Sequence, residues 1–240
     1  QYVILVGLDG STWKALLSSD YGATWTTKVS TTDSALAWNR VEMSANGQVI
    51  VAGLGNGYFT VSKDYGTNWT QRNITLGDFV ISPDGQALLD VNGLLFRGSD
   101  LTTATSQSFP VTAWFNSPSY AESIALSNVA AYAGGTYQSA VGMPLEPKHL
   151  RMAFGSGWVL YSAPGMYSSG VMPSADDTRI ISEAYYSVGN ANNGLYYSTN
   201  QDSTRKQFFS GTNPNIYNTG NGINGRISSN GLRWNVGRLT

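Results

Sequence analysis

Residues 41–70 decide the fold, and they read VEMSANGQVIVAGLGNGYFTVSKDYGTNWT. Asn-Gly pairs at 46–47 and 56–57 each separate apolar or alternating runs. This is the strongest short hairpin signal, because both central residues of a type I′ turn need a positive φ. A third turn at 64–66 precedes a strand marked by Trp69. The stretch therefore predicts a meander of four antiparallel strands, and because such a sheet has two bare apolar faces, it needs copies of itself to be stable.

The copies are visible as small polar turns that follow a first strand. These turns start at Ser44, Ser82, Ser127, Ser174 and Ser229. The spacings between the serines are 38, 45, 47 and 55 residues, and a ring of five such units would close. Periods of about 40–50 residues with four strands per unit are typical of β-propellers. We therefore predict an all-β, single-domain β-propeller over residues 1–240, built of four-stranded antiparallel blades.

The two ends of the chain predict how the ring closes. Residues 3–6 match the second strand at 49–52, so the chain enters without a first strand of its own, and residues 225–231 supply a first strand and its turn. We expect the N- and C-terminal strands to pair in one of five blades, because this leaves no open edge. Residues 232–237 also have the pattern of a second strand, so six blades, one of them incomplete, are the alternative.

A second repeat lies in the turn between the third and fourth strands. It reads SSDYGATW at 18–25 and SKDYGTNW at 62–69, with weaker copies at 98–101, 161–165 and 198–202. The first two copies resemble the Asp-box, also called the bacterial neuraminidase repeat. That motif occurs on propellers of sialidases, other glycoside hydrolases, sorting receptors, assembly factors and lectin-like modules. The resemblance implies a propeller framework with this turn on the face away from the ligand.

The Asp-box residues are expected to be structural. Asp accepts hydrogen bonds from turn N–H groups, Gly takes the positive-φ position, and Trp packs against the neighbouring sheet. The alternative, catalytic carboxylates or metal ligands, is disfavoured. The residues assigned to this structural role are Ser18, Asp20, Gly22, Trp25, Ser62, Asp64, Gly66 and Trp69.

Composition restricts the classes of function. The chain has 240 residues, 27 Gly, no Cys, 12% charged residues and a net charge of −1. With no basic block we expect no nucleic-acid partner, and no apolar run is long enough to span a membrane. The Ser, Thr, Asn, Gly and Tyr content suits an extracellular, cell-surface or virion protein. Because the chain begins with Gln1 rather than Met, we expect that an upstream segment has been removed.

The irregular connections are the expected ligand face. They lie at about 102–122, 134–156, 187–194 and 210–224, between strands four and one or two and three. Long loops in a repeat fold commonly carry function. The candidate ligand-binding residues on them are Trp114, Phe115, Tyr120, Tyr137, Arg151 and Tyr217. The aromatic residues could stack on sugar rings; the alternative is that the loops bury their own aromatics as a plug.

Tests for enzyme chemistry give no catalytic residues. His149 is the only histidine, so a Ser-His-Asp site is disfavoured and a multi-His metal site is excluded. A glycosidase needs two facing carboxylates, and the four glutamates are Glu42, Glu122, Glu146 and Glu183. The sialidase Phe/Tyr-Arg-Ile-Pro motif is absent. We expect no metal and no cofactor, although oxygen ligation of Ca²⁺ at an Asp/Asn turn stays open.

Three functions follow from the sequence. The first is a non-catalytic surface or extracellular adhesion module that recognises glycan or protein through the loop face. The second is a structural subunit of an extracellular or virion assembly such as a filament, fibre or shell, with self-assembly. The third is a glycoside hydrolase. In a secretory pathway, Asn73 of the sequon 73–75 is the better acceptor for glycosylation.

Overall fold

The computed structural model describes most of the first half of the chain and separate segments of the second. The described residues are 2–33, 37–98, 101, 104–106, 123–137, 146–156, 159–160, 171–184, 194–199, 206–210, 223–227 and 234–238. They contain β-strands only, which confirms the all-β prediction. The chain divides into two compact units, the first formed by 1–90 with 94–105 and the second by 91–93 with 106–240.

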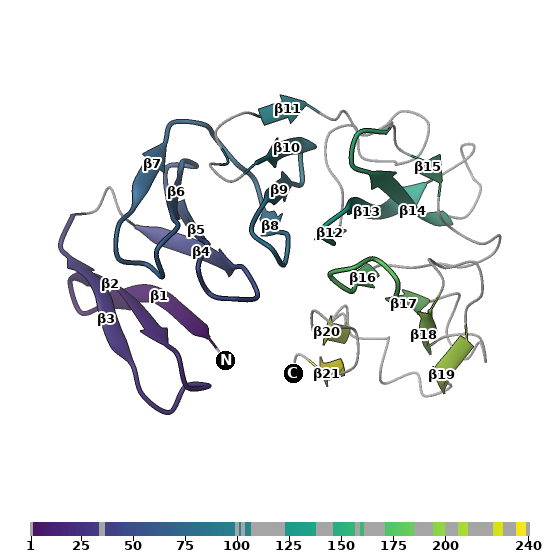
Figure 1. Cartoon of the computed structure of the whole chain (residues 1–240), viewed down its shortest axis with the longest axis horizontal. Coiled ribbons are helices and arrows are strands. Elements are labelled where there is room, and N and C mark those ends of the chain that lie inside the picture. The colour runs from purple at the N-terminus through teal and green to yellow at the C-terminus, as the bar shows by residue number, and fades with distance from the viewer. Residues whose placement is uncertain are drawn as a thin grey trace. The chain divides into compact units, whose positions relative to one another are not determined.

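The first unit contains three antiparallel sheets (Figure 1). The first sheet has three strands and the next two have four each. Strand β4 lies next to β1 on one side and β8 on the other. The strands are β1 (Val3–Asp9), β2 (Thr12–Ser18), β3 (Thr26–Thr31), β4 (Trp38–Met43), β5 (Ile50–Leu54), β6 (Phe59–Ser62), β7 (Thr70–Arg72), β8 (Phe79–Ile81), β9 (Ala87–Asp90), β10 (Leu94–Arg97) and β11 (Ala104–Ser106).

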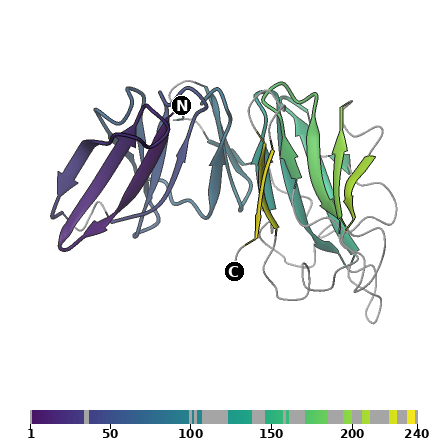
Figure 2. The same cartoon turned by 90° about the horizontal axis from the view of Figure 1, so that it is seen from below.

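The second unit also contains three antiparallel sheets, of four, four and two strands. Strand β16 lies next to both β12 and β20. The strands are β12 (Ser123–Leu126), β13 (Ala130–Tyr137), β14 (Glu146–Ala153), β15 (Val159–Leu160), β16 (Val171–Pro173), β17 (Ile180–Ala184), β18 (Gly194–Ser198), β19 (Lys206–Ser210), β20 (Ile223–Ile227) and β21 (Trp234–Arg238). Figure 2 shows the same strands from a direction at right angles, in which the turns that join them are seen at the strand ends.

The predicted meander is confirmed as the sheet β4–β7. Its strands are joined in order, but the type I′ turns expected at the two Asn-Gly pairs are not formed, because Gly47 and Gly57 take positive φ values of 79° and 86° whereas Asn46 and Asn56 do not. The first strand begins earlier than expected, at Trp38, whose side chain is buried. All five residues of β5 are buried because neighbouring sheets cover both faces of the strand. As expected, the β4–β7 sheet does not stand alone, and the sheets that cover it are β1–β3 and β8–β11 of the first unit.

Two apolar clusters hold the first unit together. One joins β4–β7 to β8–β11 and includes Phe59 and Phe96, whose rings meet edge to face with centroids 5.6 Å apart. The other includes Ala15 from β2 together with Trp38 and Leu54 from the next sheet. Burial of such apolar surface is the dominant favourable contribution to folding. These clusters fix the sheets that carry the candidate site described below.

The small polar turns are one repeated structure. In each turn the serine Oγ accepts a hydrogen bond from a backbone N–H later in the turn, at 2.9–3.0 Å. The donor lies five residues after Ser44, Ser82 and Ser174, and three residues after Ser127. Each of these serines is almost fully buried. Neighbouring turns are joined through the backbone, as in the bond from Ala45 N–H to the carbonyl oxygen of Pro83 at 2.7 Å. The repeat predicted from the serine spacing is thus a structural repeat in these four turns.

The loop expected over 134–156 is wrong at both ends, because residues 130–137 and 146–153 pair as strands β13 and β14. The first sheet, β1–β3, has no counterpart of β4 among the described residues, as expected. The described strands from the two chain ends belong to separate sheets, β1–β3 and β20–β21, so their pairing in one blade is not observed.

Candidate functional site

The turn at 18–25 is closed by its own side chains. Ser18 Oγ donates to Asp20 at 2.7 Å and accepts from Gly22 N–H at 2.8 Å, and Thr24 N–H donates to Asp20 at 2.8 Å. The Thr24 hydroxyl and N–H, together with Ser18, lower the pKa of Asp20 to about 2, because these bonds favour the charged carboxylate. Trp25 keeps 39% of its surface exposed. Asp20 therefore acts as a turn acceptor here.

The turn at 62–69 repeats this arrangement. Ser62 Oγ donates to Asp64 at 2.9 Å and accepts from Gly66 N–H at 2.9 Å, while Asn68 N–H donates to Asp64 at 2.8 Å. The Asn68 backbone and side-chain hydrogen bonds lower the pKa of Asp64. Trp69 donates its indole N–H to the Gly66 carbonyl oxygen at 2.9 Å. Its ring packs against the apolar cluster that contains Ala15, Trp38 and Leu54. Both carboxylates are occupied by their own turns.

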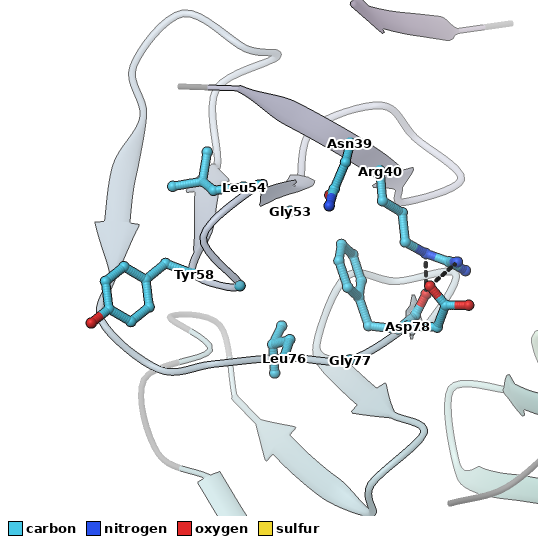
Figure 3. A pocket seen from close by; sticks show the side chains of 11 residues that line it. Asn39, Arg40, Gly53, Leu54, Tyr58, Leu76, Gly77 and Asp78 are labelled. Carbon is cyan, nitrogen blue, oxygen red and sulfur yellow. Dashed lines mark hydrogen bonds and ion pairs between the residues drawn. The ribbon is translucent and has the colours of Figure 1, made fainter. Parts of the chain in front are cut away.

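A pocket of about 380 Å³ opens at the other end of the β4–β7 sheet. Its walls come from the start of β4, the β5–β6 turn and the connection 72–79 that leads from β7 to β8 (Figure 3). Successive turns of an antiparallel meander alternate between its two ends, so the turn at 62–69 lies at the opposite end from this pocket. The pocket therefore occupies the end on which ligands are expected, although its connections are short ones.

Arg40 is the most constrained polar side chain of the pocket. Its Nε donates to the Phe79 carbonyl oxygen at 3.0 Å, and its Nη1 pairs with Asp78 at 3.0 Å (Figure 3). Its Nη2 pairs with Glu42 at 3.3 Å, and the guanidinium carbon lies 5.4 Å from the centroid of the Phe79 ring. These contacts bridge two sheets, because Arg40 lies on β4 and Phe79 begins β8.

The rest of the lining combines apolar surface, polar side chains and glycine. Asn39 and Asp78 contribute an amide and a carboxylate, while Leu76 and Phe79 are buried and contribute apolar surface. A Cβ placed on Gly53 would stand 3.0 Å from Asn39 Oδ1 and 3.2 Å from a Phe79 ring carbon. Glycine at this position therefore keeps open the space between the amide and the ring. A small pocket with a few convergent polar groups is the usual form of a ligand site.

Sequence reasoning missed these pocket residues. It weighed only the long connections and did not examine the short turn at 55–58 or the connection at 72–79. The local signal was the pair Gly77-Asp78 just ahead of a strand, at a strand-four-to-one connection. The pairing of Arg40 with Asp78 has no local sequence signal, because the two residues belong to different repeats.

Arg151, a predicted ligand-binding residue, lies in a buried polar cluster of the second unit. It contacts Asp177 through Nε at 3.2 Å and through Nη2, while Tyr132 O–H donates to Asp177 at 2.6 Å. Asp177 is fully buried, in the turn between β16 and β17, so the cluster joins two sheets. Burial, followed by the Asp177 carboxylate, raises the pKa of Tyr132 well above its usual range.

The remaining predicted residues divide into two groups. Trp114, Phe115, Tyr120 and Tyr217 lie outside the described residues, whereas Tyr137 ends β13, where its register partner is Glu146. Asn73 is described and exposed, and its Oδ1 accepts from Gln71 at 3.1 Å. Of the other glutamates considered, Glu122 is not described, and Glu183 lies on β17 opposite Leu195.

Among the residues that the structure describes, no group of three or more His, Cys, Asp or Glu side chains could hold a metal ion. No helix in this part of the chain is long and apolar enough to cross a membrane.

Comparison with known proteins supports a propeller framework. No protein-family model and no curated protein matches the chain. The GH74 enzyme of Niastella koreensis is similar, with a TM-score of 0.62 and 18% identity over 98% of this chain and 42% of that chain. The β-propeller domain of the Trilobed protease from Pyrococcus furiosus has a TM-score of 0.64 and 9% identity over 100% of this chain and 75% of that chain.

A third solved structure, the tricorn protease, has a TM-score of 0.54 and 10% identity over 81% of this chain and 21% of that chain. The chain thus spans less than half of the length of the GH74 enzyme. At these identities the likeness concerns the fold alone. Together with the antiparallel sheets, it identifies a β-propeller framework.

Proposed function

We propose that the chain is a non-catalytic binding module that recognises a glycan or a surface protein through the loop face of its propeller. The observation that carries the proposal is the pocket at the end of β4–β7, where Asn39, Arg40 and Asp78 converge beside the ring of Phe79. The amide and the carboxylate offer planar hydrogen-bonding groups, and the half-buried Tyr58 of the same lining offers aromatic surface, whereas Phe79 is buried. Both are what a sugar or a protein side chain requires.

The predicted loop aromatics belong to the same proposal. Trp114, Phe115, Tyr120 and Tyr217 belong to connections predicted to bind ligand, and Tyr137 is the last residue of β13. Aromatic side chains combine a large apolar surface with defined geometry. The composition favours a cell-surface, extracellular or virion location. In a eukaryotic secretory pathway, exposed Asn73 would accept a glycan.

The test is binding of the purified chain to a broad glycan array and to candidate surface proteins. Two variants test the two candidate regions separately: Asn39→Ala with Asp78→Ala in the pocket, and Trp114→Ala with Tyr120→Ala and Tyr137→Ala among the predicted aromatics. Asp9→Asn is a matched control, because Asp9 is an exposed carboxylate that pairs with Lys14 at 2.6 Å. Saturable binding lost in either variant set and kept in the control supports the proposal.

The other two functions are outcomes of the same set of measurements. Concentration-dependent assembly of the chain without ligand binding would favour a structural subunit. Release of reducing sugar from a polysaccharide, abolished by Glu122→Gln or Glu183→Gln, would favour a glycoside hydrolase. Either result would replace the proposal.

The propeller is proposed to be a single domain over residues 1–240, with the first sheet completed by a C-terminal strand in a five-bladed ring. The three-stranded first sheet, which lacks a counterpart of β4, supports this, whereas the pairing of β20 with β21 in a sheet of their own favours the six-bladed alternative. Amide hydrogen exchange tests it: removal of residues 223–240 should increase exchange along β1. Unchanged exchange would favour six sheets without paired ends.

A further inference from the structure

The charge of the pocket opposes anionic ligands. Arg40 is the basic side chain of the pocket, and each of its nitrogens already has a protein oxygen partner: Phe79 carbonyl, Asp78 and Glu42. One guanidinium and two carboxylates leave this group with a formal charge of −1. Three of the five N–H groups of Arg40 are thus directed at protein oxygens, and the two paired carboxylates exceed its positive charge, so an incoming anion meets net negative charge beside Arg40.

The groups that remain available suit hydroxyls. The Asp78 side chain is 73% exposed and uses Oδ1 for Arg40, so Oδ2 can accept from a ligand. Within the described residues, the Asn39 side chain makes no hydrogen bond to protein, so its amide can both donate and accept. A sugar ring carries adjacent hydroxyls that donate and accept in turn, which matches a carboxylate beside an amide.

The lining of the pocket suits a compact ligand, with the half-buried Tyr58 as its aromatic surface. The Phe79 ring lies beside Gly53, and the pocket is also lined by Leu76 and by Gly55, Gly57 and Gly77. Glycine allows a ligand to approach the backbone closely. The volume of about 380 Å³ lies at the lower end of the range for ligand pockets. It therefore suits a short saccharide segment rather than a large ligand.

We infer that this pocket binds uncharged sugar units through Asn39 and Asp78 and discriminates against anionic sugars, with Arg40 positioning the Asp78 carboxylate. The inference rests on the proposed function and adds its ligand class. The resemblance to Asp-box propellers of sialidases does not suggest it, because sialic acid is anionic. The discrimination comes from the fixed negative charge of Asp78 at the exposed edge of the pocket.

The experiment uses the whole chain on an array of matched glycans: neutral oligosaccharides, their sialylated forms and their uronate-containing forms. For the wild-type chain we expect at least tenfold stronger binding to neutral members. Asp78→Asn should keep neutral binding within about threefold, because the amide keeps an acceptor, and should reduce the discrimination to less than threefold. Asp9→Asn, an exposed carboxylate at a different sheet, should change neither value.

A second substitution tests the position of the site. Gly53→Ala should reduce neutral glycan binding at least tenfold, because the added methyl group enters the space between Asn39 and Phe79. Gly7→Ala is its control, since a Cβ there meets nothing within 4 Å. Thermal melting checks that the variants are folded; if Gly53→Ala unfolds, the charge discrimination and its reduction in Asp78→Asn still decide the inference.

The outcomes separate the two proposals. Glycan binding with equal or greater affinity for anionic members overturns the inference and leaves the binding module standing. The same holds if discrimination persists in Asp78→Asn, or if a folded Gly53→Ala chain binds normally. Binding to no glycan overturns the glycan form of the proposed function, and the inference with it.

Discussion

Replacement of Asp177 by Asn should destabilise the second unit through the loss of a single charge. Asp177 is fully buried and accepts hydrogen bonds from Tyr132 and Arg151. Asn has the same shape and tolerates the left-handed backbone at this position, where φ is 64°. The substitution therefore keeps the packing, removes the counter-ion of the Arg151 guanidinium, and replaces one carboxylate oxygen acceptor with an N–H donor.

The magnitude follows from the burial of the pair. Removing one partner of a buried ion pair costs ~3–5 kcal/mol. The Arg151 side chain keeps 15% of its surface exposed, which gives the cation some access to water. We therefore expect a loss near the lower limit, about 3 kcal/mol. Tyr132→Phe removes the hydrogen bond that Tyr132 donates to Asp177 and the one that it accepts from Arg151 Nε, and should cost about 1.5–3 kcal/mol.

The assay is urea unfolding at pH 7, followed by tryptophan fluorescence and circular dichroism. The variant that combines Asp177→Asn with Tyr132→Phe should lose less unfolding free energy than the sum of the two single losses. The reason is that Tyr132 and Arg151 share the Asp177 carboxylate. Asp9→Asn serves as control: its pair with Lys14 is exposed, and no measurable change is expected. A loss for Asp177→Asn no larger than in the control, or strict additivity in the double variant, would refute the reasoning.

Two further predictions concern turns. The Asp20 carboxyl should titrate near pH 2 by NMR, and Thr24→Val should shift the midpoint toward 3.8. Because the pKa of Asp20 is lowered in the folded state, these hydrogen bonds contribute fully to stability above pH 3.8. Their contribution is lost as the pH falls through about 2. A wild-type midpoint of 3.8 would contradict this. Gly85→Ala should destabilise by about 2–4 kcal/mol in urea unfolding, since the new Cβ lies 2.8 Å from Val49 at a φ of 74°. Gly10→Ala, with positive φ but open space, should cost only about 1–2 kcal/mol, and equal losses would rule out the steric reason.

Local sequence was sufficient to predict the strands and turns of the first unit. The serine turns and the turns at 18–25 and 62–69 close through side chains two to five residues apart. Their geometry therefore depends on nearby residues only. The continuous apolar residues of β5 likewise indicated a strand covered on both faces.

The same reasoning failed at β14. Residues 146–153 read EPKHLRMA, and the repeat pattern places them in an insertion between strands two and three that carries Arg151 as a candidate ligand-binding residue. Their pairing with β13 makes them a strand, and the partners Tyr132 and Asp177 place Arg151 in a buried cluster. Those partners lie 19 and 26 residues away, in another strand and another sheet, beyond the range of any local pattern.

What the sequence determined by itself is the repeat: short strands, turns with their own hydrogen bonds, and apolar residues on both faces of central strands. What only the tertiary structure decided is which polar residues meet between repeats. Arg40 pairs with Asp78 because β4 lies beside β8, and Asp177 reaches Tyr132 because the β16–β17 turn packs on β13. Turns depend on residues close in the chain, whereas the candidate pocket depends on the packing of one sheet against the next.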